Sequence, residues 1–413
     1  MPPRLNLFIK VIFVILLSTG FTILLEYAGW LRGFELAALD SSMRARLHLA
    51  QPKVSRNIII VTISDEDYRY IFAAKSPLDA RGVEELIKAI SSAQPAVLAV
   101  DIDTSDEAFK SMKIPENVPI VWATGAAIDQ EGKVKPPLPI ALGDTQPQPS
   151  LTGIAVVPSD SDGIVRAYMR KFGSYDSFEW IIAKAYCARV EQDPISKAQL
   201  ADSYSRISSR CDEIHRLDQK PAEDGELSLD LLGDRSAFQH FTARSILDAY
   251  HADDQQSLAK LKGTVVLLGG LFYAARDEYP TPVGRMAGVE LTAHAIDSEL
   301  RGGGFHRPAE VIMLSLNLVG GIGILLLFIR YGLGKGCLIS GLVIVVIAPL
   351  WSLLAFRSFA YTAYFLPIFF ALLVHQLYEQ AHYYQHQALH KLNHPKPQPH
   401  AADSPADPSD KQS

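Results

Sequence analysis

Residues 57–63 read Asn57-Ile-Ile-Ile-Val-Thr-Ile63 and carry the clearest structural signal in this 413-residue chain. An unbroken run of β-branched side chains favours a strand that is buried on both faces, as in parallel sheets. Two further runs share this character, Ala96-Val-Leu-Ala-Val100 and Gly263-Thr-Val-Val-Leu-Leu268, and Ile120–Ala123 is a candidate for another strand. The sequence therefore predicts an α/β domain with mainly parallel, buried strands.

Helical patterns lie between these runs. Ala80–Ser92 places Val83, Leu86 and Ile87 on one face and ends before Pro95, so the first two strands and this helix predict a right-handed βαβ unit. Gly269-Gly270 is expected to turn the late strand. Three other helices and one turn are predicted: Leu36–Asp40 onward, Ser177–Val190, Gly288–Leu300 and the turn Asp160–Gly163 before a strand at Ile164–Arg166. The stretch from Gln192 to Asp230 is polar and irregular, and its structure is left open.

Four apolar stretches flank this domain, one before it and three after it. Each approaches the ~20 residues that a helix needs to cross a bilayer. They cover Leu7–Leu25, Ala309–Ile329, Cys337–Phe356 and Tyr361–Leu377. The small residues Ser18-Thr-Gly20 keep a cleaved signal peptide as an alternative, but apolar residues resume at Phe21, which favours an uncleaved anchor.

Lysine and arginine in the short flanks predict the orientation. Arg4 precedes the first apolar stretch and Lys10 lies near its start, and Arg330 and Lys335 lie in the loop after the second. Because positive charges are retained in the cytoplasm, both termini are expected inside and the polar domain outside. We therefore expect a cytoplasmic N-terminus with the first transmembrane helix (1–31), an extracytoplasmic domain (32–307), three transmembrane helices (308–377) and a cytoplasmic tail (378–413), all in the inner membrane.

Acidic side chains follow the predicted strands. Asp65 comes after the first strand, and Asp101 and Asp103 close the second. In open α/β sheets, ligands bind in the crevice beyond the carboxyl ends of the strands, which makes these residues candidates for a ligand or cation site. The alternative is that they cap the following turns.

A second group of candidates lies late in the domain. Asp277 follows the late strand, and Glu290 and His294 are four residues apart on one predicted helix, so they could face the same ligand or cation. A helix cap and a buried histidine explain the same residues structurally. These three residues complete the set of candidate ligand-binding positions.

Histidines and cysteines leave two further questions open. His382, His386, His390 and His394 recur every fourth residue in the tail and could bind a metal, or could form a polar helix face. Beyond Pro395 the composition is that of a disordered end. Cys187 and Cys211 could pair in an oxidising compartment or remain free thiols.

No catalytic constellation is recognisable. The chain has no G-x-x-x-x-G-K-[ST], H-E-x-x-H or G-x-S-x-G motif, and the Ser257-x-x-Lys260 spacing is short enough to arise by chance. The formal charge of −6 indicates no nucleic-acid partner. The chain is therefore expected to be neither an enzyme nor dependent on a cofactor.

Several stretches together resemble the CHASE type 2 family, the extracytoplasmic sensory modules of bacterial cyclases and histidine kinases. The matching stretches are LDSSMRARL, NIIIVTISDEDY, AVLAVDID, DSDGIVR and KGTVVLLGGLFYAARDEYPTPVGRMAGVELTAHAIDSEL, within Leu39–Leu300. The resemblance implies an α/β sensor module held by flanking helices. Family members usually carry an output domain after the last helix, whereas too few residues follow Leu377 here for one.

The expected function is therefore that of a stand-alone membrane sensor. Its outer domain would recognise an unknown envelope signal and relay it through the helices to a separate cytoplasmic or membrane signalling protein. The family's use of paired helices also suggests a homodimer. The alternative is a structural protein that scaffolds an envelope complex.

Overall fold

The computed structural model describes residues 32–50, 57–126, 151–192, 204–219, 227–229, 231 and 237–304, with isolated positions elsewhere. The described residues from 36 to 304 belong to one compact unit. Within the described residues, no helix combines the length and the hydrophobicity needed to cross a membrane. The four predicted apolar spans, like the tail, lie outside the described residues except at isolated positions.

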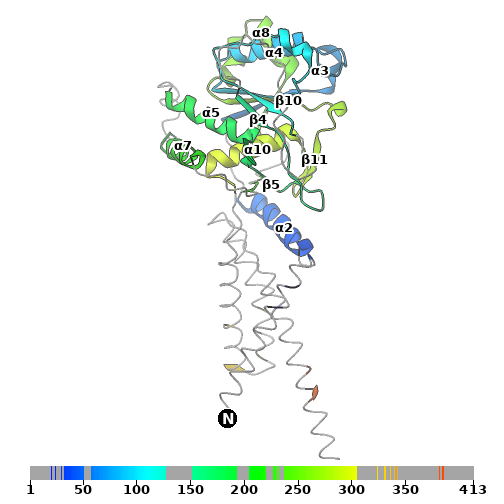
Figure 1. The fold of residues 1–413 in the computed structure, drawn as a ribbon, viewed down its shortest axis with the longest axis vertical. Helices are drawn as coiled ribbons and strands as arrows, with labels where there is room; N and C mark the ends of the chain where they lie inside the picture. The colour runs from blue at the N-terminus through cyan, green and yellow to red at the C-terminus, as the bar shows by residue number, and fades with distance from the viewer. Residues whose placement is uncertain are drawn as a thin grey trace, which may run out of the picture. The chain divides into compact units, whose positions relative to one another are not determined.

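A six-stranded sheet, in which every neighbouring pair is parallel, forms the centre of this unit (Figure 1). The strands in spatial order are β4 (Leu151–Ile154), β3 (Ile120–Thr124), β2 (Val97–Asp101), β10 (Val265–Gly270), β1 (Ile58–Ile63) and β9 (Gln239–Thr242). The predicted α/β class with parallel buried strands is confirmed, including the candidate strand at Ile120–Ala123.

The late strand β10 lies between β1 and β2. Val265 pairs with Ile58 on one side and with Val97 on the other. The predicted unit of two parallel strands and one connecting helix is therefore present, but its two strands β1 and β2 are not neighbours, because β10 lies between them. The prediction that Gly269-Gly270 turns this strand is wrong, because both residues belong to β10. A side chain at Gly269 would begin only 2.8 Å from Cγ2 of Val289, so this glycine lets a helix approach the strand.

Helices cover both faces of the sheet (Figure 1). Alternate strand residues point to opposite faces, so Ile59 and Val61 contribute to one core while Ile58 and Ile60 contribute to the other. The first core contains residues of α4 (Ala80–Ser92) and α8 (Ala243–His251), and the second those of α5 (Phe178–Gln192) and α10 (Gly288–Arg301). This two-sided cover explains why the inner strands β1, β2, β3 and β10 are buried along almost their whole length.

The remaining elements are shorter or lie outside the two main layers. The helices are α2 (Arg32–Ala50), α3 (Asp65–Tyr70), α7 (Tyr204–Asp218) and α9 (Gln255–Leu258), with 3-10 turns η1 (Glu107–Ser111), η3 (Ala259–Leu261) and η4 (Tyr273–Ala275). Three antiparallel pairs complete the described fold: β11 (Glu278–Thr281) with β12 (Gly284–Ala287), β5 (Ala167–Tyr168) with β8 (Leu227–Ser228), and β6 (Lys171–Phe172) with β7 (Tyr175–Asp176).

The structure defines two segments that the sequence left open or described only in part. The polar region after Gln192 contains α7, which a disulfide between Cys187 and Cys211 fastens to α5, with 5.3 Å between the two Cα atoms. The turn Asp160–Gly163 is present, with Gly163 donating its N–H to the Asp160 carbonyl at 2.8 Å. The strand after it begins at Ala167 rather than at Ile164.

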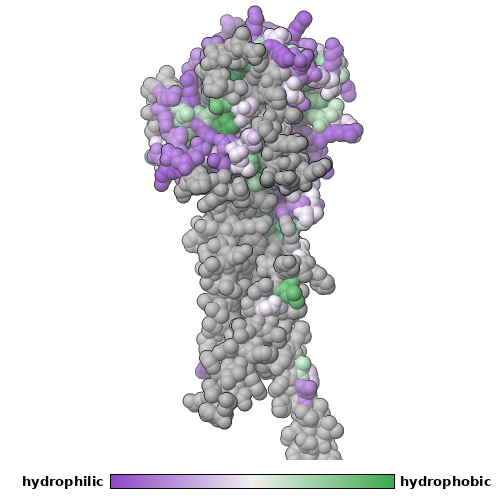
Figure 2. All heavy atoms as spheres, in the orientation of Figure 1, coloured by the Kyte–Doolittle hydropathy of each residue, from purple (hydrophilic) through white to green (hydrophobic). Residues whose placement is uncertain are grey.

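Apolar side chains of α2 pack into a third, smaller core. Leu39 and Met43 are buried there with Tyr168 and Leu291. On the face drawn in Figure 2, most of the coloured side chains are hydrophilic, as expected where the apolar residues fill the cores. The helix α2 is therefore part of the folded domain and not an appendage.

Gly153 offers a test of how closely α5 must approach the sheet. A Cβ atom at this position of β4 would lie 2.5 Å from the Cα atom of Phe178. Because backbone cannot yield as a flexible side chain can, Gly153→Ala should destabilise the domain by about 1–3 kcal/mol. Urea unfolding of the full-length protein measures this. Gly163→Ala, at a positive φ but with open space, serves as the comparison for strain without a clash; equal losses would contradict a steric origin.

Candidate functional site

The carboxyl ends of the central strands meet at one edge of the sheet. Asp101 is the last residue of β2 and pairs with Gly269 of β10. The Cβ atom of Asp101 would lie 3.5 Å from a Cβ built on Gly269, and Val289 at the start of α10 is closer still. The bare glycine thus brings the Asp101 side chain and the first turn of α10 together.

Asp277 reaches the same place from the loop that follows β10. A Cβ atom on Gly288 would lie 2.3 Å from Oδ2 of Asp277, so the carboxylate occupies the space that any other residue at 288 would fill. The backbone carbonyl of Asp277 also accepts the N–H of Gly288 at 3.0 Å. Gly288, the first residue of α10, therefore permits the position of Asp277 over the helix N-terminus.

A third carboxyl group, Glu179, comes from the first turn of α5 on the same face as α10. It is buried, with 6% of its surface exposed. The negative charge of Asp101 acts on it, as the charge of Asp277 acts on Asp101. We call Asp101, Glu179 and Asp277 the carboxyl cluster.

Burial changes the acid strength of all three groups. It raises the pKa of Asp101 to about 7, helped by the negative charge of Asp277. It also raises the pKa of Glu179 to about 7. Burial raises the pKa of Asp277 too, against hydrogen bonds from Tyr279 and Gly288 that favour its charged form. The cluster can therefore hold or release protons near neutral pH, and it can both donate and accept hydrogen bonds.

These shifts predict how stability depends on pH. A carboxyl group that binds its proton more tightly in the folded state stabilises the fold at low pH and loses that contribution as the pH rises. The window runs from the ordinary values, 3.8 for Asp101 and 4.5 for Glu179, to about 7. Asp101→Asn and Glu179→Gln should therefore gain stability relative to the parent protein at pH 8, and gain none at pH 4.

Urea midpoints of the full-length protein between pH 4 and pH 8 check this expectation. Glu107→Gln is the matched control, because this exposed carboxyl group pairs with Lys110 and its pKa is lowered. A parent protein and an Asp101→Asn variant with parallel pH profiles would contradict the assignment.

The other acidic candidates on this edge serve local structure. Asp65 begins α3 and accepts the N–H of Tyr273 at 2.9 Å. Asp103 accepts the N–H of Ser105 at 3.0 Å and its hydroxyl at 2.7 Å in an exposed turn. The structure thus brings Asp101 and Asp277 together and gives Asp65 and Asp103 separate hydrogen-bond partners.

Glu290 and His294 also have separate surroundings. Glu290 is 2% exposed and accepts the N–H of Ala287 at 2.9 Å, which caps α10. His294 is 1% exposed and meets the ring of Phe238 edge to face, with 4.9 Å between centroids. Burial, with the charge of Arg301, lowers the pKa of His294 to about 3, so this imidazole is neutral.

Within the described residues, no group of three or more His, Cys, Asp or Glu side chains could hold a metal ion. The tail histidines His382, His386, His390 and His394 lie outside these residues.

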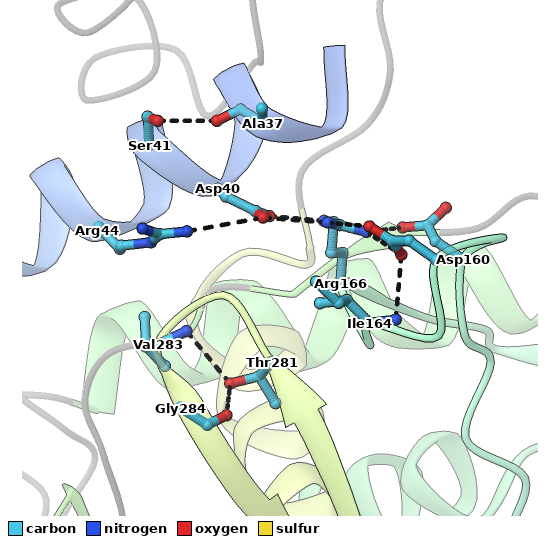
Figure 3. Close-up of polar contacts among 11 residues, drawn as sticks. Ala37, Asp40, Ser41, Arg44, Asp160, Ile164, Arg166, Thr281, Val283 and Gly284 are labelled. Carbon is cyan, nitrogen blue, oxygen red and sulfur yellow. Dashed lines mark hydrogen bonds and ion pairs between the residues drawn. The ribbon is translucent and has the colours of Figure 1, made fainter. Parts of the chain in front are cut away.

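Sequence reasoning missed a buried arginine that joins α2 to the Asp160–Gly163 turn (Figure 3). Arg166 is 2% exposed. It donates to Asp40 at 2.6 and 3.0 Å, to Asp160 at 2.9 Å and to Asp162 at 2.7 and 2.9 Å. Burial alone would lower the pKa of Arg166, but these carboxylates raise it above its ordinary value, and the same hydrogen bonds lower the pKa of Asp162 to about 2.

A second buried cluster surrounds Glu299 near the end of α10. Glu299 is fully buried and accepts from the Tyr168 hydroxyl at 2.6 Å and from Arg170 at 2.7 and 3.0 Å. Arg210 of α7 donates to the Glu299 carboxylate at 2.9 Å and to its backbone carbonyl at 2.5 Å. In both clusters, hydrogen bonds join residues that are more than 80 positions apart along the chain. Such contacts cannot be predicted from a local sequence pattern.

Comparison with protein families agrees with the resemblance read from the sequence. The CHASE2 domain model matches residues 11–333, well over half of the chain. Comparison with curated proteins and with solved structures finds no match. The match includes the parallel sheet, the carboxyl cluster and both arginine clusters. The chain therefore belongs to the CHASE2 domain family, a family of extracellular sensory domains.

Proposed function

We propose that this protein is a non-enzymatic membrane sensor, whose CHASE2 domain recognises an envelope signal and passes its state to a separate signalling protein. The observation that carries the proposal is the carboxyl cluster at the carboxyl edge of the sheet. Asp101 and Glu179 bear raised pKa values without a cation among the causes of either shift. Groups perturbed in this way concentrate at functional sites, since they would otherwise only reduce stability.

The chemistry of the cluster limits what it can recognise. Carboxyl groups with a pKa near neutrality respond to protons and favour ligands that bring positive charge or hydrogen-bond donors. Their place beyond the middle strands is where open α/β sheets bind ligands. Binding would shift the domain only to the extent that the ligand prefers one of two states.

Two observations support a location outside the cytoplasm. The disulfide between Cys187 and Cys211 is of a kind that persists in oxidising compartments. The flanking apolar stretches and their lysines and arginines predict the same orientation from the sequence. An alkaline phosphatase reporter fused near Ser150 tests the topology, because this enzyme needs disulfides and is active only outside the cytoplasm. We expect an active fusion. An inactive phosphatase fusion together with an active β-galactosidase fusion at the same position would overturn the proposed location.

The sensor role itself is tested by crosslinking in native membranes, followed by affinity purification and mass spectrometry of the intact protein. We expect a homodimer and a kinase or cyclase that lacks its own sensor domain. Asp101→Asn should change recovery of that partner at least twofold, whereas Glu107→Gln should leave it unchanged. Recovery of cell-wall or secretion components alone would instead favour a scaffolding role.

A further inference from the structure

We propose that Arg166–Arg170 forms a tie that couples α2 to the C-terminal end of α10, so that a displacement of one is transmitted to the other. The inference goes beyond the sensor role, since it concerns coupling inside the domain and holds whatever the signal is. In the sequence, α2 follows the first predicted membrane span, and the end of α10 precedes the second. The two coupled elements are thus the ones at which the chain enters and leaves the domain.

One end of the tie holds α2. Arg166 donates hydrogen bonds from Nε and Nη2 to the two carboxylate oxygens of Asp40 (Figure 3). This two-point contact fixes the angle between the guanidinium and carboxylate groups as well as their distance. Asp40 is 6% exposed, so neither partner can exchange this contact for water in place. A shift of α2 along its axis must therefore pull on Arg166 or break the two-point contact of the buried Asp40 carboxylate, while Arg166 keeps Asp160 and Asp162.

The other end of the tie holds the last turn of α10. The Tyr168 hydroxyl donates to Glu299 and accepts the N–H of Gly304 at 2.9 Å, so it spans the point at which α10 ends. Arg170 grips both carboxylate oxygens of Glu299 in the same two-point manner. The tie therefore contacts the helix on both sides of its C-terminus.

The segment between these contacts is anchored along its backbone. Ala167 and Tyr168 pair with β8, and Leu229 donates its N–H to the carbonyl of Arg166 at 2.8 Å. Ser177, just before α5, donates its N–H to the carbonyl of Arg170 at 2.8 Å. These hydrogen bonds hold the segment at both ends, and in the proposed coupling a displacement of Arg166 passes along it to Tyr168 and Arg170.

Hydrogen exchange of the full-length protein, followed by mass spectrometry, tests the coupling. Asp40→Asn should accelerate exchange at least tenfold at residues 302–304, which lie beyond the other end of the tie and do not contact Asp40 in any hydrogen bond or ion pair described above. Glu299→Gln should reciprocally accelerate exchange at least tenfold in residues 40–48, because coupling between two sites acts equally in both directions. The control is Arg285→Gln, which removes an exposed ion pair with Glu278 and should change neither segment.

Acceleration confined to the substituted end would overturn the proposal. If a variant opens the whole domain, amides of the central strands β1 and β10 accelerate as well. In that case the milder substitutions Arg166→Lys and Tyr168→Phe, made singly and together, test the coupling. The free energies of unfolding from urea titrations of these variants form a double-mutant cycle. A tie predicts that the combined loss differs from the sum of the single losses, and strict additivity would refute it.

Discussion

Replacing Glu299 by alanine is expected to destabilise the folded domain by about 3–5 kcal/mol. The reason is the positive charge that loses its partner: Arg170 and Arg210 both pair with this fully buried carboxylate, and Arg210 keeps only its ion pair with the half-exposed Glu213. Removing one partner of a buried ion pair strands the other charge without water, which costs far more than losing an exposed pair. The Tyr168 hydroxyl also loses its acceptor.

Urea unfolding of the purified full-length protein, followed by tryptophan fluorescence, measures this loss. Glu278→Ala is the matched control, since it removes an ion pair whose side chains are 47% and 63% exposed, and it should change stability by less than about 0.5 kcal/mol. Glu299→Gln should fall between the two, because it keeps an oxygen acceptor and loses the charge. A loss at Glu299→Ala no larger than that at Glu278→Ala would show that the cluster contributes little.

Removal of the disulfide is the second large effect that we expect. Cys187→Ser with Cys211→Ser should cost about 2–4 kcal/mol, since the bridge restricts the unfolded chain over a sequence separation of 24 residues. A further loss is expected in the folded state, because Arg210 stands next to Cys211 and depends on the placement of α7 to reach Glu299.

The same urea experiment, run with and without a dithiol reductant, separates the two contributions. Reduction of the parent protein should reproduce most of the loss seen in the double variant. Cys337→Ser, at the third cysteine of the chain, is the control and should respond to reductant as the parent does. If the double variant matches the parent in stability, α7 must be held by its other contacts alone.

The four inner strands β1, β2, β3 and β10 could be predicted from their composition, whereas the two edge strands β4 and β9 and the order of the sheet could not. Runs such as Asn57–Ile63 are buried on both faces, and that property is written locally in the β-branched residues. The position of β10 between β1 and β2 depends on contacts between residues that are far apart in the sequence. The prediction of a turn at Gly269-Gly270 was wrong because it too depended on a distant contact. A glycine pair signals a missing side chain, and only the approach of Val289 tells why it is missing.

The candidate site was predictable in part. Asp101 and Asp277 were identified because acids beyond strand ends are conspicuous in a sequence. Glu179 was missed, since an acid in the first turn of a helix ordinarily favours the helix dipole and gives no sign of burial. Arg166 and Glu299 were missed because their partners come from distant parts of the chain. A usable signal did exist for Glu299, as it shares the helix α10 with the buried residues Val289 and Ile296.

The central position of β10 also has a consequence for how the protein is made. A nascent chain delivers β1 and β2 long before residues 265–270 leave the ribosome, yet these two strands touch only through β10. Until then, each presents an unpaired edge on which other chains could add. Products that stop short of residue 270 would keep those edges permanently, so we expect them to aggregate or be degraded by proteases instead of persisting as shortened domains.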